Sequence, residues 1–134
     1  MTRLELKNHQ VWWNLTEILE NLESDALVRE HLYLCDYKVC GYWDEQDEYY
    51  EEITLPRTLE AELVSSSIGV TQKERFLQLK FVLKASAVEA IAQPNNNVQR
   101  IGELVLVYDE NLEFVDENWL LDIDSSLLEV KRTP

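Results

Sequence analysis

Apolar residues recur at helical spacing near the start of the chain. The members of this stripe are Val11, Leu15, Ile18 and Leu22, three or four positions apart, as on one face of a helix. Asn8 stands where an N-cap is expected, and Ser24 and Asp25 interrupt the pattern. The sequence therefore predicts a helix over residues 9–23.

From Val28 onward the apolar positions alternate, which is typical of β-strands. Residues 28–43 predict a long strand with apolar side chains on both faces, and residues 58–66 predict a second strand. The stretch SSSIGV predicts a turn. Two more strands are expected over residues 101–108 and 112–123, joined by a hairpin turn at Asp109–Asn111.

Residues 72–92 fit two secondary structures. As a strand, this stretch places one apolar row on one face, consisting of Leu77, Leu79, Phe81, Leu83 and Ala85. A helix is suggested by Thr71 and Glu74, which have the spacing of an N-terminal capping box. On that helix, however, Lys80 and Lys84 would lie within the apolar face. We favour the strand because it buries fewer polar groups. Residues 86–89 predict a short helical turn, and QPNNN at residues 93–97 predicts a loop.

These elements predict an α+β fold, with an N-terminal helix packed on an antiparallel meander sheet of four to six strands. Short connections between consecutive strands favour a meander over the parallel sheets of nucleotide-binding folds. A chain of 134 residues is expected to form one domain over residues 1–134. Residues 126–134 are predicted to be a tail that is frayed or docks weakly.

Acidic residues outnumber basic ones by 26 to 12, and the formal net charge is −14. Such a charge repels the phosphates of nucleic acids and anionic membrane surfaces, so neither is an expected direct partner. The sequence contains no apolar run of the ~18 residues that a membrane helix needs. The first residues lack the features of a signal peptide. We therefore expect a cytoplasmic protein.

No motif of known catalytic or cofactor chemistry stands out. The three glycines are not clustered, as a phosphate-binding loop would require. On the predicted strand His31 and Cys35 would lie about 13 Å apart, too far to share a metal ion. Cys35 and Cys40 would lie about 16 Å apart, beyond disulfide reach, so free thiols are expected. We predict no catalytic residue, cofactor or metal site, and a protein that is not an enzyme.

Two stretches concentrate the negative charge. The first places six carboxylates among aromatic rings between Gly41 and Glu52, and the second covers residues 109–117 and continues to Asp122 and Asp124. Aromatic side chains supply interface area, and charges set specificity and association rate. The sequence therefore predicts a surface that docks a positively charged protein. Its candidate residues are Tyr42, Trp43, Asp44, Asp47, Glu48, Tyr49, Glu51, Asp109, Glu113 and Asp116.

A sharper version of this hypothesis is an inhibitor of a nucleic-acid-binding protein that imitates nucleic acid. Duplex DNA carries one charge per ~1.7 Å of axis, whereas the carboxylates of residues 44–52 are spaced about one per 5 Å on an extended strand. Mimicry therefore requires both acidic stretches side by side on one face.

A calcium-binding protein is one alternative. Asp109, Asn111 and Glu113 match the first positions of an EF-hand loop, but Phe114 and Leu120 stand where that loop needs Gly and a bidentate Glu. Only a calcium site of another kind stays open.

A small-ligand or dimerisation module of the helix-on-sheet type is a further alternative. Phe76, Val82 and Phe114 are expected on the surface and mark a homodimer face of the sheet.

Overall fold

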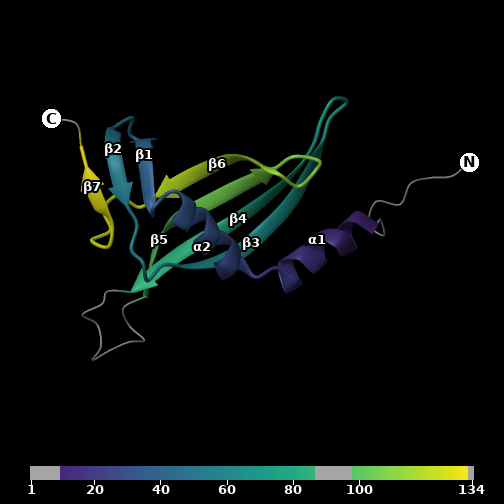
Figure 1. Ribbon diagram of the computed structural model, residues 1–134, viewed down its shortest axis with the longest axis horizontal. Helices are drawn as coiled ribbons and strands as arrows, with labels where there is room; N and C mark the ends of the chain where they lie inside the picture. Colours follow the sequence, from purple (N-terminus) through teal and green to yellow (C-terminus); the bar gives the residue numbers. More distant parts are fainter. Residues whose placement is uncertain (1–9, 87–97, 133–134) are drawn as a thin grey trace, which may run out of the picture.

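The computed structural model describes residues 10–86 and 98–132. Two helices precede seven strands, which form two antiparallel sheets (Figure 1). The elements are α1 (Gln10–Asn21), α2 (Ser24–Leu34), β1 (Lys38–Trp43), β2 (Tyr49–Thr54), β3 (Glu60–Val70), β4 (Arg75–Ser86), β5 (Val98–Tyr108), β6 (Phe114–Leu121) and β7 (Glu129–Lys131). The predicted α+β fold is confirmed: α1 packs on the β3-β4-β5-β6 meander. The second sheet, β1-β2-β7, was not predicted.

The structure corrects the predicted strand over residues 28–43, because its first part is the helix α2. Val28 and Leu32, one helical turn apart, are fully buried against the sheet. Tyr33 and Leu34 are 77% and 79% exposed, and these apolar side chains produced the two-faced strand pattern. The ~13 Å separation of His31 and Cys35 inferred from a strand therefore does not hold.

His31 and Cys35 have other partners in the folded chain. His31 pairs with Glu117 of β6, and its ring lies 5.0 Å from the ring of Phe114. The Cys35 thiol donates to the carbonyl oxygen of Leu32 at 3.4 Å. Cys35 and Cys40 are both free.

The turn expected at SSSIGV lies further along the chain. β3 continues to Val70, and the turn follows at Thr71, whose Oγ1 accepts the backbone N–H of Glu74 at 2.9 Å. This bond explains the capping-box spacing without a helix. Gly69 stays inside the strand because the ring of Phe76, opposite it on β4, covers its face.

The strand structure favoured for the next segment is confirmed as β4, residues Arg75–Ser86. The predicted inward row is confirmed as well: four of its members are buried and Leu77 is half-buried. The N-cap at Asn8, the start of the first helix at His9, the helical turn at 86–89 beyond Ser86 and the loop at 93–97 lie outside the described residues.

The segment after Ser125 does not fray as far as Arg132. β7 pairs with β2, and the side chain of Leu128 is 7% exposed. An apolar side chain buried in this way holds its segment against the rest of the fold. Residues 126–132 are therefore docked on the fold rather than frayed.

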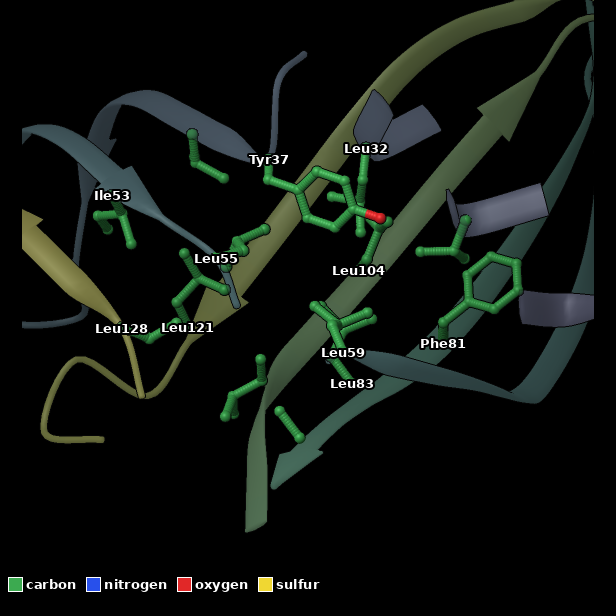
Figure 2. Packing of buried hydrophobic residues seen from close by; sticks show 14 of the residues in the cluster. Leu32, Tyr37, Ile53, Leu55, Leu59, Phe81, Leu83, Leu104, Leu121 and Leu128 are labelled. Atoms are coloured by element: carbon green, nitrogen blue, oxygen red, sulfur yellow. The ribbon is translucent and has the colours of Figure 1, made fainter. Parts of the chain in front are cut away.

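The core lies between the two sheets and α2. Figure 2 shows its buried side chains, which come from α2, from both sheets and from the connections between them. The backbone N–H of Leu55 donates to the carbonyl oxygen of Tyr37 at 2.8 Å, which extends the pairing of β1 with β2 by one residue and places both side chains in the core. Phe81 and Leu104 contribute from the larger sheet and Ile53 from the smaller one.

Gly41 allows β1 to bury two side chains that strict alternation would separate. The pairs Val39–Ile53 and Tyr42–Tyr50 are all buried although they lie three residues apart along each strand. Gly41 between them has a φ of +69°, a left-handed conformation that glycine adopts without steric cost. This local twist turns Tyr42 toward the larger sheet.

Candidate functional site

Two hairpins are built on one seven-residue pattern: aromatic, Asp, Glu, Gln or Asn, any residue, Glu, aromatic. It covers residues 43–49 between β1 and β2, and residues 108–114 between β5 and β6. In the first, Oδ1 of Asp44 accepts the backbone N–H groups of Gln46 at 2.8 Å and of Glu48 at 2.9 Å. In the second, Oδ1 of Asp109 accepts those of Asn111 and Glu113 at 2.9 and 3.0 Å.

The remaining positions of the pattern also correspond. Asp47 and Leu112 both have a φ of +61°. The flanking rings lie in contact, with centroids 5.0 Å apart for Trp43 and Tyr49, and 6.4 Å apart for Tyr108 and Phe114. Asp44 and Asp109 therefore shape their turns rather than stand free for a partner.

The two acidic hairpin turns do not form one surface, and only Asp122 and Asp124 of the second stretch lie near the first. β6 runs from the β5–β6 turn toward the smaller sheet, so the two acidic turns lie at opposite ends of this strand (Figure 1). The seven steps from Phe114 to Leu121 span roughly 23 Å at ~3.3 Å per residue. Glu113 and Asp116 are thus far from the first stretch, and the condition for nucleic-acid mimicry is not met.

The aromatic residues expected to bind a partner face different ways. Tyr42 is 8% exposed, and its hydroxyl accepts the backbone N–H of Leu121 at 2.9 Å, so it joins the two sheets and presents little surface to a partner. Trp43 is 62% exposed and packs on Tyr49, on the opposite face of the hairpin from Tyr42 and Tyr50. Glu51 and Asp47 are exposed.

A cleft of about 560 Å³ opens where the β1–β2 turn meets the ends of the two sheets. Its walls are the β1–β2 turn, the start of β5, the end of β6 with the segment after it, and the residue after β7. Its charged lining residues are Asp44, Glu45, Glu48, Asp122, Asp124, Arg100 and Arg132. Five carboxylates thus face two guanidinium groups.

Arg132 occupies one side of the cleft. Its guanidinium donates to Oε2 of Glu48 and to the hydroxyl of Tyr50, both at 3.0 Å, and lies over the Tyr50 ring at 4.8 Å. Tyr50 in turn donates its hydroxyl proton to Oδ2 of Asp44 at 3.0 Å. Burial and the hydrogen bond to Asp44 raise the pKa of Tyr50, so the phenol stays protonated at neutral pH.

The opposite side of the cleft keeps its negative charge. Arg100 pairs with Glu103, outside the lining. Within residues 10–86 and 98–132, Glu45, Asp122 and Asp124 form no ion pair with a basic side chain. Backbone N–H groups, above all that of Glu48, lower the pKa of Asp44, which stays ionised. The cleft can therefore hold a cationic group.

Sequence reasoning named Asp44 and Glu48 but did not assign the rest of the lining. Asp122 and Asp124 appeared only as a continuation of the second acidic stretch. Arg132 lay in the segment expected to fray, and no local signal marks its contact with Glu48, 84 residues earlier.

The described residues do not support the calcium alternative. In that part of the chain no three His, Cys, Asp or Glu side chains converge closely enough to hold a metal ion.

The face predicted to form a homodimer is only partly as expected. Phe76 and Val82 lie half-buried on the outer face of the larger sheet. Phe114 lies on the other face, against His31, which corrects its placement. The ion pairs Lys80–Glu103 and Lys84–Glu62 also lie on this sheet.

Comparison with known proteins found no matching family model, no matching curated protein and no matching solved structure. Among the described residues, no helix combines the length and the apolar character needed to cross a bilayer. The geometry of the cleft is therefore the basis for assigning a function.

Proposed function

We propose that this protein binds a positively charged segment of another protein in the acidic cleft between its two sheets. The observation that carries the proposal is the charge of the cleft. Three of its carboxylates, on Glu45, Asp122 and Asp124, have no basic partner in the described part of the chain. A concave surface lined mainly by one sign of charge concentrates ligands of the opposite sign.

The cleft supports this function better than the whole acidic surface does. Exposed carboxylates on a convex surface are screened by salt within about 8 Å under physiological conditions. In the cleft, several carboxylates lie on walls that come from separate segments, so one cationic group can approach more than one of them.

The test removes the unpaired charges and leaves the shapes of the side chains. We would measure binding of fluorescently labelled deca-arginine by anisotropy to the wild type and to the triple variant Glu45→Gln, Asp122→Asn, Asp124→Asn. These three side chains make no hydrogen bond within the described residues, so the variant should fold normally. At about 0.5 kcal/mol for each exposed charge, the three together contribute about 1.5 kcal/mol, so affinity is expected to fall roughly tenfold.

A second triple variant controls for net charge. Glu17→Gln, Glu20→Gln and Glu74→Gln remove the same charge from α1 and from the β3–β4 turn, on exposed side chains outside the cleft. This control should lose less than about threefold in affinity. The cleft variant should also show a smaller dependence of affinity on salt concentration. Equal losses in the two triple variants would overturn the proposed function.

A further inference from the structure

β7 and the arginine that follows it occupy the cleft in the way a partner would. β7 pairs antiparallel with β2, with Glu129 opposite Thr54, Val130 opposite Ile53 and Lys131 opposite Glu52. This pairing carries the guanidinium of Arg132 to Glu48 and Tyr50. The protein thus holds an extended segment on a sheet edge with an arginine in an acidic cleft.

This occupant is weakly held. β7 has only three residues, and each of them is exposed. The ion pair that follows it, between Arg132 and Glu48, is exposed as well, and such pairs contribute little to stability. Short segments with few buried apolar contacts open at low free energy while the rest of the fold stays intact.

Leu128 marks where the detachable part begins. Its side chain is buried, and the turn before it is closed by backbone bonds, including the N–H of Leu128 to the carbonyl oxygen of Ser125 at 3.3 Å. Release of residues 129–132 therefore costs no buried apolar side chain. This release frees the edge of β2 for another strand and leaves the carboxylate of Glu48 without its ion-pair partner Arg132.

We propose that β7 and Arg132 are a displaceable internal ligand, and that the partner is an extended segment that adds to the β2 edge and places its own arginine in the cleft. Main-chain hydrogen bonds to an open sheet edge give affinity in this mode of recognition, and side-chain pockets give specificity. Arginine suits the pocket because a planar guanidinium donates to Glu48 and Tyr50 at once and stacks on the Tyr50 ring. The inference rests on the proposed function, since the partner is drawn to the same acidic cleft.

An internal ligand competes with the partner, so its removal should tighten binding. We would compare Arg132→Ala with Lys131→Ala. The second variant removes the same charge at the neighbouring residue, and the Lys131 side chain forms no ion pair within the described residues. The probe is the labelled peptide Gly-Ser-Glu-Val-Lys-Arg-Gly-Ser, which repeats residues 129–132. Arg132→Ala should bind it up to about fivefold more tightly than the wild type, and Lys131→Ala should change the affinity less than twofold.

Hydrogen exchange of the wild-type protein then shows whether the strand leaves. At saturating peptide, the amides of Glu129–Lys131 should exchange faster, whereas those of β2 stay protected. A scrambled peptide of equal charge, with its arginine moved to the first position, should leave the exchange of the Glu129–Lys131 amides unchanged.

Two results would overturn the inference: β7 amides that keep their protection at saturation, or equal gains in affinity for Arg132→Ala and Lys131→Ala. The proposed function would survive either result if the cleft triple variant still lost deca-arginine binding, because a cation would then bind beside Arg132. It would fall separately if that triple variant bound like its charge-matched control.

Discussion

An alanine at position 102 would place its Cβ atom 2.4 Å from the carbonyl oxygen of Leu120 and 3.1 Å from the Cα atom of Leu121. Both obstacles are backbone atoms of β6, and Gly102 pairs with Leu121 across the β5–β6 ladder. A side chain in that position could rotate away from the new Cβ atom, but the backbone of β6 can avoid it only if the end of the strand shifts. Gly102 therefore sets the close approach of β5 and β6 at the wall of the cleft.

Gly102→Ala is expected to lower the free energy of unfolding by about 2–3 kcal/mol, in the upper part of the range for overpacking, because no flexible side chain can relieve the contact. A chain of this length should then melt roughly 10 °C lower. Urea unfolding at 25 °C would measure the change as a lower midpoint with an unchanged slope. Gly41→Ala is the matched control: its Cβ meets nothing closer than 3.6 Å, so only the left-handed backbone opposes it, at about 1 kcal/mol. A loss below about 0.5 kcal/mol for Gly102→Ala would refute the reasoning.

Three further predictions test other parts of the structure. Leu128→Ala should cost about 2–4 kcal/mol in urea unfolding, because Leu128 is buried, whereas a frayed segment would show almost no change. Cys40, which is exposed, should react with a thiol reagent at pH 8 well before Cys35, since burial raises the pKa of the Cys35 thiol; equal rates would contradict this placement. Backbone N–H groups lower the pKa of Asp44 below its ordinary value of 3.8, so the stability it contributes is present above that pH and is lost as the pH falls further. Wild-type stability should therefore decline more steeply below this pH than that of Asp44→Asn, and parallel declines would show that the carboxylate makes no such contribution.

The larger sheet follows the sequence closely because its side chains alternate. Leu79, Phe81 and Leu83 point inward from β4, and each intervening residue points out, as the period of two predicts. The sequence also predicts α1, which spans Gln10–Asn21 of the expected range 9–23, because its apolar stripe recurs at the helical period. In both cases the residues of one element, by their own periodicity, show which of its side chains are buried.

α2 was missed because its exposed face carries apolar side chains. The exposed Tyr33 and Leu34 directly follow the buried Leu32. The apolar residues of this stretch therefore fit both the alternation of a strand and the spacing of a helix. Burial against the sheet decides between the two, and burial is a property of the assembled fold. The turn at SSSIGV was misplaced in the same way, because Phe76 protects Gly69 from across the sheet.

The candidate site was likewise predictable only in part, because some of its features follow from the local sequence and others from the tertiary structure. The acidic stretches were visible, but two of their residues, Asp44 and Asp109, are used inside the hairpins that they begin. Which of their residues meet depends on the direction and length of β6, which places the two acidic turns at opposite ends but brings Asp122 and Asp124 to the first stretch. The residues that complete the cleft come from the ends of other strands.

By itself the sequence determined the class of the fold, most of the strands and the sign of the charge, because each of these follows from residues close together in the chain. The tertiary structure alone decided where the negative charge is left unpaired. The hydroxyl of Tyr42 joins Leu121, 79 residues away, and Arg132 reaches Glu48 across 84 residues. Contacts over such separations form only when both sheets are in place, so no local pattern records them.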